Sequence, residues 1–217
     1  MPDLATRHPK VILQNNFQPV CQVSCTAIIG LGNPGIQYLN SRHNLGFWLL
    51  DKFAESQNRN FIEKSKYCAE ICKMSFQDKS FMLVKPITFM NESGKFLKNQ
   101  LSSNNCELDK SILIHDELTL PVGRMKISVG QGDGGHNGVK SVFSAIGKNL
   151  KRLRLGIGPK LNPEIDLADH VLSKFSPDEQ ATLEHHSLLF LDALKSLMTE
   201  GVEKAMNLYN QSLPSKI

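Results

Sequence analysis

Short apolar runs alternate with longer amphipathic segments from residue 26 onward. The short runs predict buried strands at residues 26–31, 68–74, 80–85, 111–115, 124–129 and 153–157. The longer segments predict helices at residues 41 to about 56, 92–101, about 138–146, and 176 to about 209. Strands that alternate with helices are typical of a layered α/β domain.

Two local patterns refine this arrangement. The strands at 68–74 and 80–85 flank a polar turn at residues 77–79, so they predict an antiparallel pair within a mixed sheet. Ser176-Pro177-Asp178-Glu179 has the features of a helix start, with a capping Ser, Pro at the first position and acids in the first turn. Gly201 predicts a break in this last helix.

The composition fits one globular domain. The chain has 217 residues, of which 41% are hydrophobic and 21% are charged. No apolar run approaches the ~18 residues that a membrane span needs, so the sequence predicts no transmembrane helix. The net charge of +4 permits a polyanionic partner. Residues 140–154 contain five basic side chains and no acid, which fits either a nucleic-acid contact or a solvated basic face.

The cysteines indicate a reducing compartment. Their number is odd, and no secretory signal precedes the five residues Cys21, Cys25, Cys68, Cys72 and Cys106. The Cys68–Cys72 spacing lies in a strand pattern and lacks further ligands at zinc spacing, which argues against a zinc site.

Residues 1–25 differ from the rest of the chain. They are rich in Gln, Asn and Pro and contain one acid, so they are interpreted as an N-terminal extension that is either a disordered tail or a weak organelle-targeting segment. The catalytic domain is then expected at 26–217. The location is expected to be cytoplasmic or mitochondrial.

The segment Gly30-Leu31-Gly32-Asn33-Pro34-Gly35 matches the dinucleotide-binding pattern, and Asp51 lies about twenty residues further on. However, Pro34 lacks an N–H group, and the helix that should begin within the motif starts only later. Asp51 also falls inside a helix pattern. A nucleotide site is therefore the weaker interpretation.

Polar side chains that can take part in binding or catalysis recur at the ends of the predicted elements. They are Asn33, His43, Asn91, Asp116, His136 and Asn137. Ligand clefts of open α/β sheets form where strand carboxyl ends and their loops converge. A histidine is the side chain best suited to move protons near neutrality, and a carboxylate can orient it. No nucleophile-elbow motif occurs, which leaves water as the attacking group. Each residue alone could equally be a turn or capping residue.

Five motifs occur in order along the chain: residues 30–35 with Tyr38 and Arg42-His43-Asn44, Thr88-Phe89-Met90-Asn91-x-Ser93-Gly94, His115-Asp116-Glu117-Leu118 with Pro121-x-Gly123, Gly134-Gly135-His136-Asn137-Gly138, and residues 152–158. Together these motifs resemble those of the bacterial-type peptidyl-tRNA hydrolase family. With His170-Val171-Leu172, the resemblance covers about residues 26–190.

The resemblance implies a single, monomeric three-layer α/β/α domain with a mixed twisted sheet. It implies hydrolysis of peptidyl-tRNA without metal or cofactor, with His43 as base for water, Asp116 as its partner and Asn33 at the peptide end. The residues that line the cleft around the substrate would be Tyr38, Phe89, Met90, Asn91, His136 and Asn137. Lys126 and Arg154 match positions that hold a tRNA phosphate.

The sequence departs from the family pattern at a few positions. Ser128 replaces a second lysine of the phosphate site, and Asp133 adds an acid to the glycine-rich loop at residues 130–138. After Gly158, Pro159-Lys160 replaces the usual His-Pro. These differences concern tRNA binding rather than the hydrolytic centre. The alternative function is that of a non-catalytic RNA-binding splicing factor with the same fold.

Overall fold

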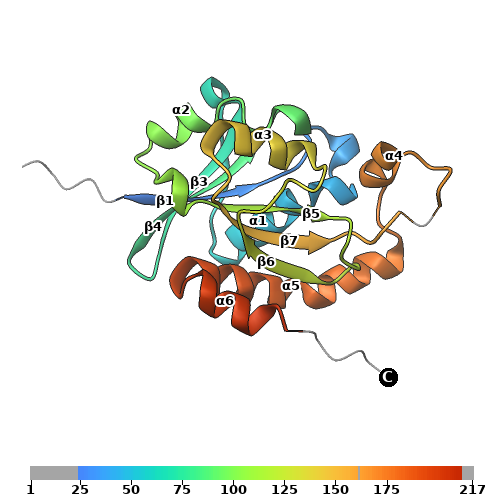
Figure 1. Cartoon of the computed structure of the whole chain (residues 1–217). Coiled ribbons are helices and arrows are strands. Elements are labelled where there is room, and N and C mark those ends of the chain that lie inside the picture. Colours follow the sequence, from blue (N-terminus) through green and yellow to red (C-terminus); the bar gives the residue numbers. More distant parts are fainter. Residues whose placement is uncertain (1–23, 161, 212–217) are drawn as a thin grey trace, which may run out of the picture.

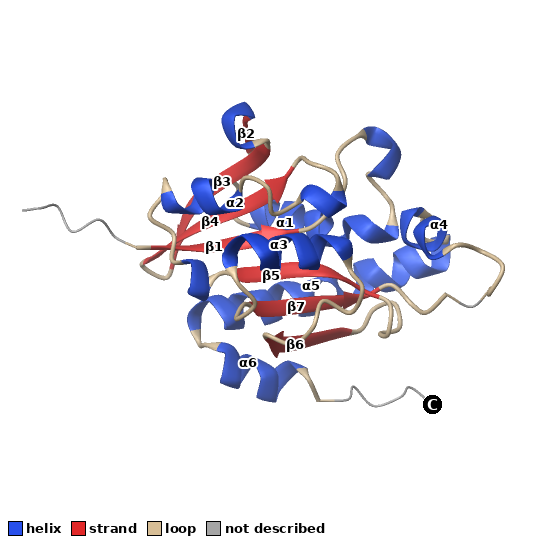
Figure 2. Cartoon of the chain, turned by 45° about the horizontal axis from the view of Figure 1, so that its top comes forward, coloured by secondary structure: helices blue, strands red, loops and turns tan. Residues whose placement is uncertain are grey.

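The computed structural model describes residues 24–160 and 162–211. One seven-stranded sheet crosses the domain in the order β2-β3-β4-β1-β5-β7-β6 (Figures 1 and 2). In chain order the strands are β1 Cys25–Gly30, β2 Ile62–Lys64, β3 Ala69–Phe76, β4 Lys79–Pro86, β5 Ile112–Glu117, β6 Met125–Val129 and β7 Lys151–Gly156. Of the predicted extension at 1–25, all but Ser24 and Cys25 lies outside the described residues, and Cys25 already belongs to β1.

The sheet is mixed, as predicted. Strands β4, β1, β5 and β7 run parallel, whereas β2, β3 and β6 pair antiparallel with their neighbours. The parallel centre directs the carboxyl ends of β1, β5 and β7 to the same edge, where the connecting loops meet. The predicted hairpin is the β3–β4 pair, in which residues 77 and 78 both have positive φ.

Helices cover both faces of the sheet. Figure 1 shows α5 and α6 below the sheet and α2 and α3 above it, with α1 on the α5 side. The α-helices are α1 Leu45–Ser56, α2 Leu97–Ser102, α3 Asn137–Ile146, α4 Leu167–Leu172, α5 Pro177–Thr199 and α6 Val202–Tyr209. One apolar cluster lies between the sheet and α1 with α5, and the other lies beneath α2 and α3. The domain thus has three α/β/α layers, and α4 stands beyond the carboxyl ends of the strands.

Most predicted elements are confirmed. The capping box of Ser176 and Glu179 begins α5, and Gly201 separates α5 from α6. The prediction of a helix at 92–101 was wrong in its first half. A 3₁₀ turn at Met90–Glu92 comes first, and α2 begins only at Leu97. Gly94 explains this, because its backbone lies directly against the backbone of Ser141 in α3. The short elements β2 and α4 were not predicted.

Helix α1 does not begin at residue 41. A 3₁₀ turn at Arg42–Asn44 comes first, and α1 follows from Leu45. The start of α1 is bonded to the backbone at the end of β1, because Phe47 N donates to Leu31 O at 3.2 Å. Leu31 is itself bonded to β5, since its N–H donates to Ile114 O at 2.9 Å. Gly46 permits this approach, since a Cβ atom there would overlap backbone atoms of Leu31 and Ile114. The turn that carries His43 is therefore held against the ends of β1 and β5.

None of the helices in the described part of the chain is both long and apolar enough to cross a membrane.

We expect Gly46→Ala to lower the free energy of unfolding by about 1–3 kcal/mol or more, because the added methyl must push the helix off the sheet. For a domain of this size, that corresponds to a fall in melting temperature of about 2–4 °C per kcal/mol. Gly132→Ala is the matched control, because a Cβ at Gly132 meets nothing within 4 Å. Equal melting temperatures for Gly46→Ala and the parent would contradict the packing argument.

Candidate functional site

A cleft of about 840 Å³ opens at the carboxyl ends of β1, β5 and β7. Every site residue predicted from the sequence, apart from Lys126, contributes to its lining: Asn33, Tyr38, His43, Phe89, Met90, Asn91, Asp116, His136, Asn137 and Arg154. These residues come from five separate loops and strand ends. The fold thus brings together side chains that lie more than a hundred positions apart.

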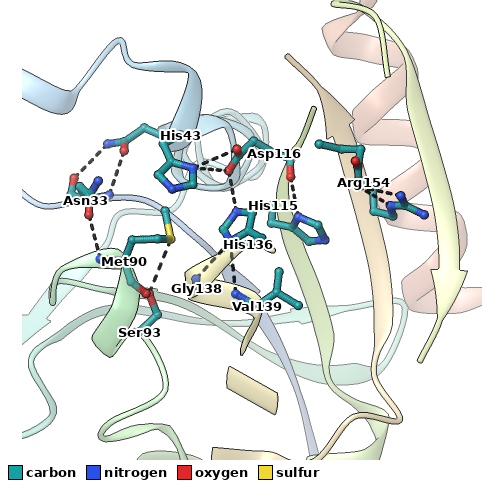
Figure 3. A network of polar contacts seen from close by, with 12 residues as sticks. Asn33, His43, Met90, Ser93, His115, Asp116, His136, Gly138, Val139 and Arg154 are labelled. Carbon is teal, nitrogen blue, oxygen red and sulfur yellow. Dashed lines mark hydrogen bonds and ion pairs between the residues drawn. The ribbon is translucent and has the colours of Figure 1, made fainter. Parts of the chain in front are cut away.

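His43 and Asp116 form a close pair. Nδ1 of His43 lies 2.9 Å from both carboxylate oxygens of Asp116, which is 3% exposed (Figure 3). Because an ionised carboxylate only accepts hydrogen bonds, the proton of neutral His43 resides on Nδ1. Nε2 therefore carries the lone pair. Burial on its own would raise the pKa of Asp116, but the adjacent rings of His136 and His43 hold that pKa well below its usual range.

His136 holds the same carboxylate from the other side. Its Nδ1 accepts hydrogen bonds from the backbone N–H groups of Gly138 and Val139, at 3.1 and 3.3 Å. Nε2 of His136 must then carry the proton, which it donates to Oδ1 of Asp116 at 2.8 Å. The first N–H groups of α3 thereby fix the tautomer of His136. The sequence analysis predicted only that His136 lines the cleft around the substrate.

Among the described residues, His43, Asp116 and His136 are the group whose donor atoms lie near enough for a metal ion, within 4.8 Å of one another. The hydrogen bonds argue against that use. With Nδ1 of His136 accepting two backbone N–H groups, a metal on Nε2 would require a fully deprotonated imidazolate. The arrangement is better suited to proton transfer.

Asn33 is held in place by Asn44. The side chain of Asn44 accepts from Asn33 N at 2.8 Å and donates to Asn33 O at 3.0 Å, and both residues are buried. The side-chain oxygen of Asn33 accepts from Met90 N at 2.8 Å. Within the described residues nothing accepts from Nδ2 of Asn33, so this N–H₂ group is left for a ligand in the cleft. The sequence analysis gave Asn44 no role, although it directly follows His43.

Arg42 anchors the turn that carries His43. Its guanidinium makes a two-pronged ion pair with Glu179, at 2.9 and 2.7 Å, and donates to Ile157 O at 2.9 Å. It also lies over the ring of Phe175, 4.7 Å from the centroid. The start of α5 is thereby tied to the site. No pattern in the sequence linked Arg42 to an acid 137 positions away.

One side of the cleft is apolar. Phe89 is 58% exposed, and α4 contributes Leu167, Val171 and Leu172, of which Leu167 is half-exposed. Exposed apolar side chains that face a concave surface are typical of a ligand site. The contribution of α4 was not predicted, because a helix of six residues is too short to show a clear apolar period.

The other side of the cleft carries charge. Arg154 forms an ion pair with Glu117, with Nη2 to Oε2 at 2.6 Å, and both side chains are largely buried. Lys126 lies opposite Arg154 in the β6–β7 register and is exposed. Arg152, which belongs to the basic stretch 140–154, is only 2% exposed. Arg152 is therefore not part of a basic surface, contrary to the expectation from charge alone.

The dinucleotide-binding interpretation is wrong. Gly35 is followed by a 3₁₀ turn at Ile36–Tyr38, and no α-helix begins before Leu45. Asp51 lies in the interior of α1, where it accepts a hydrogen bond from Lys85.

A family model described as Peptidyl-tRNA hydrolase matches residues 27–216. The chain belongs to this family. Relatives include the peptidyl-tRNA hydrolase of Lachnospira eligens, 37% identical over 84% of this chain and 98% of that protein. The hydrolase of Geobacter sulfurreducens is 40% identical over 84% of this chain and 94% of its own length. The family assignment confirms the resemblance carried by the five motifs and makes the chain an enzyme.

Solved structures agree with this assignment. A peptidyl-tRNA hydrolase from Acinetobacter baumannii matches with a TM-score of 0.77 at 31% identity, covering 89% of this chain and 98% of that one. The single α/β domain expected from the sequence is thus the fold of the family.

We expect Asn44→Ala to lower the free energy of unfolding by about 1–3 kcal/mol, because the buried N–H and C=O of Asn33 lose their partners. Amide hydrogen exchange at Asn33 and Met90 should accelerate. Asn99→Ala, at an exposed position of α2, is the control. Unchanged exchange at both amides would show that Asn44 does not hold this loop.

Proposed function

We propose that the protein hydrolyses the ester bond between peptide and tRNA in peptidyl-tRNA, with His43 as the general base. The observation that carries this proposal is the His43–Asp116 pair, which leaves Nε2 of His43 with a free lone pair in the cleft. Family membership supports the reaction, and the geometry supports the assignment of roles.

The chemistry follows from these tautomers. Nε2 of His43 removes a proton from water as the water oxygen attacks the ester carbonyl carbon. Asp116 stabilises the imidazolium that forms, through its charge and its hydrogen bond to Nδ1. When the tetrahedral intermediate collapses, the ester C–O bond breaks and the proton passes to the ribose oxygen of the leaving tRNA. The products are a free peptide acid and an intact tRNA.

Asn33 is proposed to contact the peptide end of the substrate. Its free Nδ2 group can donate to the carbonyl of an acylated amino group. A free aminoacyl-tRNA carries an ammonium group at that position, which only donates hydrogen bonds. This difference favours blocked over unblocked substrates. Tyr38, Phe89, Met90, Asn91, His136 and Asn137 are proposed to line the space around the acyl group.

Lys126 and Arg154 are proposed to bind a tRNA phosphate. Arg154 is already paired with Glu117, so a phosphate must compete with this carboxylate or share the guanidinium with it. Ser128 is buried and uncharged, and it adds no further cation. The protein is proposed to act as a monomer on peptidyl-tRNA, in the cytoplasm or mitochondria. Nothing in the site favours the splicing-factor alternative.

We expect His43→Ala to reduce hydrolysis by about 10²–10⁴-fold while the fold is retained, because the base is lost. The measurement is release of the blocked amino acid from N-acetyl-aminoacyl-tRNA, with unblocked aminoacyl-tRNA in parallel. His185→Ala, at an exposed position of α5, is the control and should be fully active. More than a tenth of parental turnover in His43→Ala would reject His43 as the base.

We expect Arg154→Ala and Glu117→Gln to act in opposite directions on full-length tRNA substrates. Arg154→Ala should raise KM and flatten the salt dependence by roughly one unit of log–log slope, because one phosphate contact is lost. Glu117→Gln should lower KM, because it frees the guanidinium. A short substrate that carries only the terminal nucleotides should be insensitive to both changes. Parallel losses on long and short substrates would mean that the ion pair is structural.

A further inference from the structure

Arg152 is a buried cation without a carboxylate partner among the residues that the structure describes. Its Nε and Nη2 groups lie 3.1 and 2.8 Å from Nε2 of His115. Its Nη1 group donates to Gly132 O at 2.8 Å and to Gly130 O at 3.3 Å. The guanidinium also lies 5.6 Å from the ring centroid of Phe143. A buried charge is costly unless its donors are satisfied, so every partner of Arg152 matters.

His115 connects Arg152 to the hydrolytic centre. It is 1% exposed, and its Nδ1 donates to the backbone oxygen of Asp116 at 2.6 Å. Its Nε2 accepts from Arg152, so the ring is neutral with its proton on Nδ1. Burial, followed by the charges of His136 and Arg152, holds the pKa of His115 well below its ordinary value, although Asp116 acts in the opposite direction. The rings of His115 and His136 also form a T-shaped contact, with centroids 5.0 Å apart.

Arg152 also holds the glycine-rich loop at residues 130–135, which leads to His136. Within this loop Gly130, Gln131, Gly134 and Gly135 have positive φ, and no helix or strand fixes residues 130–135. The two bonds from Arg152 to the carbonyls of Gly130 and Gly132 tie the loop to β7. The loop ends at His136, which supplies one of the donors to Asp116.

We propose that His115 and Arg152 form a buried positioning pair that fixes both the backbone and the carboxylate of Asp116. His115 holds the end of β5 directly, and Arg152 holds the loop that positions His136. This inference rests on the proposed function, because it assigns the pair a role in orienting His43 through Asp116. It assigns Arg152, from the basic stretch, to the interior of the site rather than to tRNA.

Kinetics with Arg152→Met test the proposal. The change keeps most of the side-chain length but removes every donor. We expect kcat to fall roughly 10–100-fold, as for a misplaced catalytic group, with KM and the salt slope unchanged. A phosphate contact would instead raise KM and flatten the salt slope by about one unit. Arg59→Met, at an exposed position distant from the cleft lining, is the matched control and should match the parent.

The pH profile separates positioning from general destabilisation. His115 faces Arg152, His136 and Asp116. The charge of Arg152 lowers the pKa of His115, so removal of the guanidinium should raise that pKa. We therefore expect the acid-side loss of kcat in Arg152→Met to move to higher pH. His115→Gln can still accept from Arg152 and should retain more kcat than His115→Leu. Identical acid limbs in Arg152→Met and the parent, or equal kcat in the two His115 variants, would overturn the proposal.

A measurement on the parent protein removes any dependence on variant folding. The side-chain ¹⁵N resonances of His115 should show a ring that stays neutral and protonated at Nδ1 well below the pH at which an ordinary imidazole titrates. Titration near the ordinary histidine range of about 6.5 would overturn the pairing. This readout is independent of His43→Ala, so loss of the proposed base and loss of the positioning pair are distinguishable.

Discussion

The buried carboxylate of Asp116 is the group on which the site depends. This carboxylate accepts hydrogen bonds from His43 and His136, while the backbone oxygen of Asp116 accepts one from His115. Without these donors, an ionised carboxylate at this depth would be strongly unfavourable. The three histidines have distinct hydrogen-bonding roles, and each tautomer follows from a neighbour that is itself fixed. The carboxylate therefore orders the surrounding rings, and the rings keep the carboxylate charged.

The parallel centre of the sheet brings these parts together. Polar residues at the ends of β1 and β5 could be recognised from the sequence, because buried apolar strands followed by polar loops give a clear pattern. The mixed sheet, the β3–β4 hairpin and the capped start of α5 followed from the same kind of local signal. The motifs then indicated which polar residues belong to one cleft. Their roles could not be read from spacing, since each also suits a turn or a cap.

Other features depended on contacts between distant segments, which no local pattern encodes. The charge of Arg152 suggested a surface residue, but the β5–β7 register pairs it with Leu113, and its buried side chain reaches the ring of His115 two residues further along β5. Arg154 likewise has an acid beside it on the neighbouring strand. Helix α2 starts late because Gly94 touches α3, and Asn44 matters only because its amide reaches Asn33. In each case a tertiary contact changed the expected role of the residue.

The ion pair between Arg42 and Glu179 has a consequence for the order in which activity appears during synthesis. The turn that carries His43 is among the first parts of the domain to be made, yet its anchor lies 137 residues later in the chain. The loop closure that joins them is a late, long-range event. A ribosome-bound chain that ends between residues 136 and 178 therefore contains His43, Asp116 and His136 but lacks Glu179, the acid that holds Arg42. The first turn of α5, which follows every strand of the sheet in the chain, therefore supplies the contact that anchors the turn carrying His43.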